Sequence, residues 1–349
     1  MKRLGKTPPF RGPNGELMPD SIAEVQYLPL GGIDQWVMIR GERIANPALI
    51  LLHGGPGFGE TPFFRRFNSP LESQFTVVYW DQRGTGKSFD RNIPRSSMTV
   101  EQFIADLDDL VEAVRKRLGQ DTVTIFGHSW GSALGALYAA RFPEKVAVYV
   151  GCEQVGDSIA AERASYAFAL AEAERRHNAK ALRELRAIGQ PPYDEARSVF
   201  VERTWIQRFE GQLSLRALWK MGRDFLGCPE ASVFDLPDIV RGFRFTLDAM
   251  WSEIRTLNLF TLVTALQTPV FFFVGRRDRW IPPETSVAYF DALKAPSKQL
   301  VWFEESAHEP FVDEPVKFNR TMLVRLRPAI DAALAARPGF VDRRSGVVA

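Results

Sequence analysis

The sequence contains few of the features that mark secreted or membrane proteins. Cys152 and Cys228 are its two cysteines, too few for a disulfide framework, and both stand in apolar surroundings typical of buried thiols in a reducing compartment. No apolar run approaches the roughly 18 residues that a membrane span needs, and no apolar segment follows the basic start of the chain as in a secretory signal. We therefore expect a cytoplasmic protein with no membrane partner.

An excess of charge of one sign is also missing. The 44 Lys and Arg residues nearly balance 42 Asp and Glu residues, which gives a formal net charge of +2. No basic block is long enough to follow a nucleic-acid backbone, so we expect no nucleic-acid partner. The 349 residues, 45% of them hydrophobic, have room for one large α/β domain with an insertion or for two domains. The sequence leaves the oligomeric state open.

Short apolar runs alternate with helical stretches in both halves of the chain. A hairpin is predicted over residues 23–41, turning at Gly31 and Gly32. Further buried strands are predicted within residues 47–57, 75–88, 123–126, 146–151, 268–280 and 299–308, and helices within 98–118, 132–140, 283–293 and 311–336. This alternation predicts a mainly parallel sheet with helices on both faces.

The alternation stops in the middle of the chain. Residues 157–264 contain no convincing strand, and their charged residues recur at helical spacing. We therefore expect a core formed by residues 1–156 and 265–337, a helical cap at 157–264, and a flexible tail at 338–349. The cap is rich in aromatic residues, and most of them are expected to pack its own small core while the rest line an apolar pocket.

The run from Gly127 to Gly131, Gly-His-Ser-Trp-Gly, places a serine between two glycines. An apolar strand precedes it, and a stretch rich in alanine and leucine follows. Such a strand–turn–helix leaves no space for β-carbons beside the serine and holds the hydroxyl of Ser129 at the tip of the turn. The sequence predicts that Ser129 is a nucleophile.

A serine hydroxyl needs a base to take its proton, and the chain offers four histidines. His177 lies in a charged helical stretch, His128 points away from its neighbour Ser129, and His53 is better placed to brace a glycine loop. His308, at the end of the final predicted strand, is expected at the carboxyl edge of the sheet with Ser129. His308 is the predicted base.

The base needs a carboxylate to fix its tautomer. Asp278 follows the strand that begins at Thr268, and the chain order Ser, Asp, His is that of an α/β-hydrolase arrangement. Glu153, after the strand that follows the serine turn, is the alternative acid. Asp278 is preferred.

Acyl transfer also needs donors for the developing oxyanion. The His-Gly-Gly-Pro-Gly run at residues 53–57 leaves backbone N–H groups accessible to a substrate. Gly55 is the expected donor from this loop, together with the backbone N–H of Trp130 after the nucleophile.

Taken together, the motifs HGGPG, DQRGTGKS, GHSWG, GRRD and SAHEP resemble those of the α/β-hydrolase superfamily, and more narrowly those of proline iminopeptidases and their relatives. The resemblance covers the chain apart from its tail. It implies an α/β-hydrolase fold, the triad Ser129, Asp278 and His308, and an oxyanion hole at Gly55 and Trp130. From the order of nucleophile, acid and base along the chain we expect a serine hydrolase that uses no cofactor and no metal. It also implies that DQRGTGKS is a structural turn.

The resemblance leaves the substrate open. Proline iminopeptidases hold the free amino group of the substrate with glutamates near a Trp-Glu pair of the cap, which Phe209-Glu210 echoes only loosely. Glu153, Glu210 and Trp205 are the residues we expect to contact the substrate. An aminopeptidase acting on a short peptide is the first hypothesis, and an esterase or lactonase acting on a small ester is the second.

Other classes fit the sequence less well. An epoxide hydrolase or dehalogenase would need an aspartate in place of Ser129. A metalloenzyme lacks clustered ligands at metal-binding spacing. A binding protein built on an inactive hydrolase scaffold is typically missing a member of the triad, and all three are present.

Overall fold

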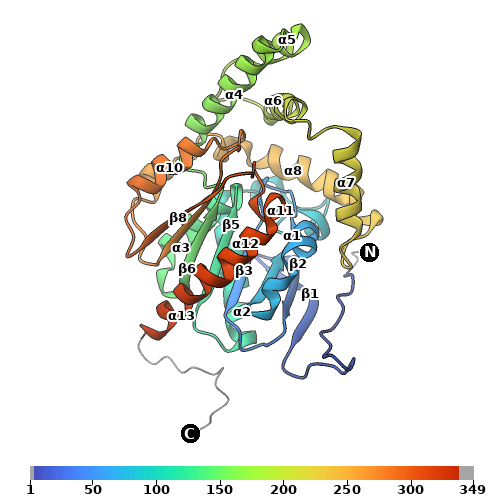
Figure 1. The fold of residues 1–349 in the computed structure, drawn as a ribbon, viewed down its shortest axis with the longest axis vertical. Coiled ribbons are helices and arrows are strands. Elements are labelled where there is room, and N and C mark those ends of the chain that lie inside the picture. Colours follow the sequence, from blue (N-terminus) through green and yellow to red (C-terminus); the bar gives the residue numbers. More distant parts are fainter. Residues whose placement is uncertain (1–3, 338–349) are drawn as a thin grey trace.

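The computed structural model describes residues 4–337 and contains an eight-stranded sheet (Figure 1). Its strands are β1 (Ile22–Leu30), β2 (Ile33–Gly41), β3 (Ala48–Leu52), β4 (Thr76–Trp80), β5 (Val123–His128), β6 (Val146–Cys152), β7 (Val270–Gly275) and β8 (Lys298–Phe303). They are arranged in the order β1-β2-β4-β3-β5-β6-β7-β8. β2 pairs antiparallel with β1 and β4, and all other neighbours are parallel. The predicted mainly parallel sheet and the predicted hairpin are confirmed.

Helices cover both faces of the sheet (Figure 1). They are α1 (Thr61–Asn68), α2 (Val100–Leu118), α3 (Trp130–Arg141), α10 (Pro283–Ala292), α11 (Pro310–Asp313), α12 (Pro315–Thr321) and α13 (Arg327–Ala335). α2, α3 and α10 contribute to one hydrophobic core, and α1 with α11 to α13 contribute to another on the opposite face. Successive strand residues alternate between the two: Ile50 joins the first core, and Leu49 and Leu51 join the second. A strand buried on both faces must be apolar throughout, as β3 is.

The predicted helical insertion is present between β6 and β7. It comprises α4 (Ser158–Arg175), α5 (Ala179–Ile188), α6 (Ala196–Phe209), α7 (Leu215–Leu226), α8 (Leu236–Ile254) and α9 (Leu259–Leu262). α8 rests on the core loops: Thr246 Oγ1 donates a hydrogen bond to the Gly84 carbonyl at 3.1 Å, and a Cβ at Gly242 would lie 2.5 Å from that same oxygen. α8 therefore anchors the insertion to the loops at the carboxyl edge of the sheet.

The end of the chain differs from the prediction in two respects. β8 ends at Phe303 instead of continuing to His308, because the N–H groups of Glu305 and Ala307 bond to side chains of Glu314 and Asp313 and not to a neighbouring strand. The single predicted C-terminal helix is divided into α11, α12, a π-turn at Met322–Leu326 and α13. Proline at the start of α11 and α12 lacks the N–H that would continue a helix from the residues before it. The predicted flexible tail, 338–349, lies outside the described residues.

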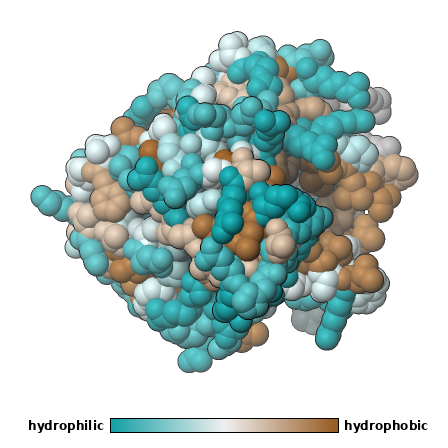
Figure 2. All heavy atoms as spheres, turned by 90° about the horizontal axis from the view of Figure 1, so that it is seen from above, coloured by the Kyte–Doolittle hydropathy of each residue, from teal (hydrophilic) through white to brown (hydrophobic). Residues whose placement is uncertain are grey.

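Exposed hydrophobic side chains gather on one side of the insertion, as the view from above shows (Figure 2). They belong to α7 and the segment leading into α8, and include Leu215, Trp219, Leu226, Val233 and Phe234.

Within residues 4–337, no helix combines the length and apolar character needed to cross a membrane.

Candidate active site

Ser129 occupies a strained turn between β5 and α3. Its backbone has φ 53° and ψ −119°, a conformation that residues other than glycine rarely adopt. α3 begins at the next residue. A Cβ at Gly127 would lie 2.2 Å from the Gly131 carbonyl oxygen, and one at Gly131 would lie 2.1 Å from the Leu52 carbonyl oxygen. Only glycine fits at either position, so the sequence pattern has a direct steric cause.

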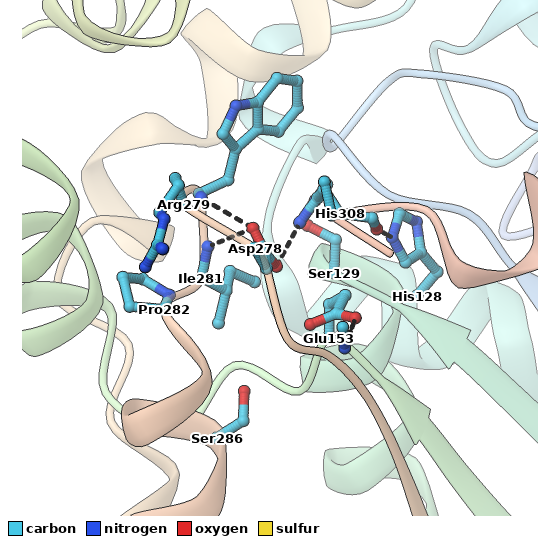
Figure 3. Close-up of polar contacts among 12 residues, drawn as sticks. His128, Ser129, Glu153, Asp278, Arg279, Ile281, Pro282, Ser286 and His308 are labelled. Atoms are coloured by element: carbon cyan, nitrogen blue, oxygen red, sulfur yellow. Dashed lines mark hydrogen bonds and ion pairs between the residues drawn. The ribbon is translucent and has the colours of Figure 1, made fainter. Parts of the chain in front are cut away.

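Asp278 and His308 meet in loops that follow β7 and β8. His308 Nδ1 donates a hydrogen bond to Asp278 Oδ2 at 2.8 Å, while Asp278 Oδ1 accepts from the N–H groups of Trp280 at 2.7 Å and Ile281 at 3.1 Å. These bonds fix the carboxylate and direct His308 Nε2 away from it. Figure 3 shows both Ser129 and Asp278 beside His308.

The surroundings of His308 favour the neutral ring. Burial lowers its pKa, the Asp278 carboxylate opposes this effect, and the positive charges of His128 and Arg203 lower it further. The net pKa of His308 lies below its ordinary value of 6.5. Burial alone would raise the pKa of Asp278, but His308 and the hydrogen bonds around the carboxylate hold it below its ordinary value. A neutral imidazole beside an ionised carboxylate can accept a proton at neutral pH.

Gly55 and Trp130 present backbone N–H groups near Ser129. Gly55 has a φ of +112°, and a Cβ there would lie 2.6 Å from the Gly57 nitrogen. Trp130 is the first residue of α3, where the N–H has no partner within the helix. In the described part of the chain, neither N–H donates to another protein group. Both N–H groups therefore lack a protein acceptor in this part of the chain, and their role as an oxyanion hole stays a prediction.

The glycine loop is held from two sides. Gln82 donates from its backbone to His53 Nε2 and from its side chain to the His53 carbonyl, each at 3.1 Å. Gln82 also accepts a hydrogen bond from the Trp130 indole at 3.1 Å. On the other side, Glu60 Oε1 accepts the Gly54 N–H at 2.8 Å. His53 thus braces the loop, as the sequence predicted.

Glu60 and His128 form a buried ion pair that the sequence did not indicate. His128 Nδ1 lies 2.7 Å from Glu60 Oε1, and His128 Nε2 donates to the His308 carbonyl at 2.7 Å. Burial opposes the charged form of His128, but the Glu60 carboxylate and its hydrogen bond raise the pKa of this histidine to about 9. Glu60 follows the glycine loop without a recognisable motif, so its role is visible only in three dimensions.

The DQRGTGKS segment serves as a structural turn. Asp81 Oδ2 accepts the Lys87 N–H at 2.9 Å. Arg83 binds Asp106 through two nitrogens at 2.7 and 2.8 Å, and both side chains are buried. These contacts join β4 to α2 and leave neither group directed at Ser129.

The three residues expected to contact the substrate lie in different surroundings. Glu153 is fully buried beneath Asp278 (Figure 3). Glu210 is exposed at the end of α6. Partial burial of its carboxyl group raises its pKa to about 7, and the negative charge of Asp278 is the second, smaller cause. Trp205 is buried within the insertion, where its indole donates to Glu184 of α5 at 2.9 Å. The structure therefore brings Glu153, but not Trp205, against the Asp278–His308 pair.

Another charged cluster of the insertion faces the loop that carries Asp278. Trp280 packs against His308 with ring centres 4.8 Å apart and ring planes tilted by 39°, and the Arg203 guanidinium lies 5.8 Å from the Trp280 ring centre. Arg203 pairs with Glu162 at 2.7 Å and with Glu202 at 2.8 Å. The second oxygen of Glu162 is buried and accepts no hydrogen bond within the described chain. The sequence analysis missed this cluster because charged residues at helical spacing are typical of exposed helices.

The sheet, the sharp turn at Ser129 and the helical insertion define an α/β hydrolase. The chain belongs to the alpha/beta hydrolase fold family, which residues 47–315 match. It is 33% identical over 309 residues to the probable aminopeptidase YbaC of Bacillus subtilis, covering 86% of this chain and 96% of the relative. A proline iminopeptidase of Heyndrickxia coagulans is 27% identical over 286 residues, covering 77% and 87%. The predicted family and its resemblance to proline iminopeptidases are confirmed.

Solved structures agree with the fold. A proline iminopeptidase of Mycobacterium smegmatis superposes with a TM-score of 0.65 at 20% identity, covering 89% of this chain and 100% of the other. An epoxide hydrolase mutant from Bacillus megaterium superposes with a TM-score of 0.53 at 18% identity, covering 85% and 98%. Because proteins with different named activities share this architecture, the structural likeness establishes the fold alone.

Proposed function

We propose that the protein is a serine hydrolase in which Ser129 is the nucleophile, His308 the base and Asp278 the acid, with no cofactor. The observation that carries the proposal is the 2.8 Å hydrogen bond between His308 and Asp278 beside the strained turn at Ser129. A base fixed by a carboxylate beside a partly exposed hydroxyl is the arrangement that acyl transfer requires.

The reaction follows from this arrangement. Ser129 Oγ attacks the scissile carbonyl while His308 Nε2 takes its proton, and the oxyanion accepts hydrogen bonds from Gly55 and Trp130. His308 then gives the proton to the leaving amine, which leaves an acyl group on Ser129. Water, activated by the same histidine, releases the acyl group and restores the serine.

The substrate we propose is a short peptide with a free amino terminus, from which one residue is released. The similarity to a probable aminopeptidase and to proline iminopeptidases supports this proposal. So does the cap, residues 157–264, which brings carboxylates toward the active site. The unpartnered oxygen of Glu162 is one candidate for binding the substrate ammonium, and Glu210 is another.

A small ester or lactone is the second candidate substrate. The observation that favours it is the pairing of Arg203 with both Glu162 and Glu202, because this guanidinium already balances charge that would otherwise attract an ammonium group. The apolar residues of the cap suit either substrate. We place the enzyme in the cytoplasm, since its two cysteines are both free and buried.

A substrate panel distinguishes the two candidates. It should contain arylamides of proline and other amino acids, the same arylamides with the amine acylated, and short acyl aryl esters. An aminopeptidase will cleave the free-amine arylamides and lose this activity when the amine is blocked. If the esters are hydrolysed well and the free-amine arylamides are not, the aminopeptidase proposal fails and the esterase proposal stands.

A further inference from the structure

Glu153 occupies the position after β6, next to the position of Asp278 after β7. Its side chain is fully buried, and its backbone lies in the left-handed region with a φ of +47°. This conformation costs a non-glycine residue of the order of 1 kcal/mol. The backbone N–H donates to the Phe273 carbonyl at 3.0 Å, which fixes the turn. A strained, buried glutamate needs a compensating role.

The two oxygens of Glu153 have different surroundings. Oε1 accepts the Gly275 N–H at 2.6 Å. Within residues 4–337, no N–H or hydroxyl group donates to Oε2, although this oxygen is buried. The neighbouring polar group is the carboxylate of Asp278 (Figure 3). An oxygen that lacks a donor and lies beside another carboxylate can be satisfied as the O–H of a neutral acid.

We propose that Glu153 is a positioning residue whose neutral carboxyl group donates a hydrogen bond to Asp278 and thereby fixes the carboxylate that holds His308. The pair shares one proton, so a single negative charge faces the imidazole. This inference rests on the proposed triad and gives Glu153 a role other than contact with the substrate.

The charges near the pair agree with this protonation. Burial raises the pKa of Glu153 well above its ordinary value, and the neighbouring Asp278 carboxylate raises it further, with a smaller effect from Asp313. The pKa of Asp278 moves in the opposite direction because His308 and Glu153 both stabilise its charged form. Two adjacent carboxyl groups with opposite shifts share one proton.

The substitution Glu153→Gln reproduces the neutral, protonated form of Glu153 and not its ionised form. The glutamine amide oxygen can accept from Gly275 and its amide nitrogen can donate to Asp278, whereas Glu153→Met retains the shape but loses both contacts. The test measures the rate at which a fluorophosphonate probe labels Ser129 as a function of pH. This reaction reports the nucleophile and its base without requiring knowledge of the substrate.

We expect Glu153→Gln to retain the wild-type labelling rate within about threefold and the midpoint of the acid limb within about 0.3 pH units. We expect Glu153→Met to slow labelling by roughly 10- to 100-fold, less than the loss caused by altering the triad acid itself. The midpoint of the acid limb reports the titration of His308, and the charged groups that face this histidine are Asp278, His128 and Arg203. Circular dichroism and thermal melting check that both variants are folded.

Two results would overturn this role. If Glu153→Gln moves the acid limb to lower pH by one unit or more, a negative charge has been removed, and Glu153 was ionised. If Glu153→Met labels as fast as the wild type, the residue does not position Asp278. Labelling of a Ser129→Ala variant would instead overturn the proposed nucleophile, and the inference about Glu153 with it.

Discussion

The side chain of His128 donates a hydrogen bond from Nε2 to the backbone carbonyl of His308 at 2.7 Å. Through its other nitrogen, His128 contacts Glu60, which in turn accepts the N–H of Gly54. One buried ion pair therefore links the loop of the proposed base, the turn of the proposed nucleophile and the loop of the proposed oxyanion hole. The relative position of these three loops depends on His128 keeping its charge.

This ion pair predicts a pH-dependent stability. The pKa of His128 rises from 6.5 to about 9 on folding, so its contribution is fully present below pH 6.5 and is lost as pH rises through 9. A shift of this size corresponds to about 3 kcal/mol. His128→Gln keeps a donor for the His308 carbonyl but cannot titrate. Chemical denaturation at a series of pH values should show the wild type losing its advantage over this variant between pH 6.5 and 10. A constant difference would contradict the prediction.

Ser129→Ala should remove hydrolysis while leaving the fold unchanged. Loss of a nucleophile that acts together with its base costs more than about a thousandfold in turnover. Turnover of a good substrate measures the loss, and a thermal melt serves as the folding control. Residual activity above about one thousandth of the wild type would mean that another group attacks the substrate.

Asp278→Asn should lower turnover by up to about 10⁴-fold, because an amide donates toward His308 and favours the wrong tautomer. Arg83 and Asp106 provide a matched control: Asp106→Asn alters an equally buried carboxylate that binds Arg83 and lies outside the site. Asp106→Asn should lower stability without changing the turnover per folded molecule. Equal losses of turnover in both variants would show that Asp278 has only a structural role.

The pH profile should follow the neutral form of His308. Its pKa lies below 6.5, so the base is unprotonated above that value and activity should fall only as pH drops through the lowered pKa. The acid limb of kcat/KM, measured on a well-hydrolysed substrate, should have its midpoint below pH 6.5. A midpoint above pH 7 would indicate that Asp278 outweighs burial and the positive charges of His128 and Arg203.

Much of the architecture was predictable because it depends on local patterns. Buried strands of a parallel sheet are continuous apolar runs, and the turn at Ser129 requires glycines that the sequence displays. The pairing of Asp278 with His308 was predicted from chain order, and the two lie within hydrogen-bonding distance. Whether they act in catalysis remains a prediction.

Other features of the site depend on contacts between distant segments. His128 appeared to have no role because it points away from Ser129, yet its ring reaches Glu60, 68 positions earlier in the chain. The sequence could not show that Glu153 is buried and Glu210 exposed, since both are glutamates at the end of an element. Glu162 could not be singled out from the sequence, because the insertion contains many charged residues at the spacing typical of exposed helices.

The choice of substrate gives the last prediction. If the unpartnered oxygen of Glu162 binds a substrate ammonium, Glu162→Gln should raise KM for free-amine arylamides roughly tenfold or more, with a smaller change in kcat, because the lost interaction is made equally in the ground state and the transition state. Glu172→Gln is the matched control, since Glu172 lies on the same helix, α4, but pairs with the exposed Arg175 and not with Arg203. It should leave KM unchanged. Steady-state kinetics on free-amine and amine-blocked arylamides measures both effects. An unchanged KM in Glu162→Gln, with Glu210→Gln raising it instead, would move the ammonium site to the end of α6.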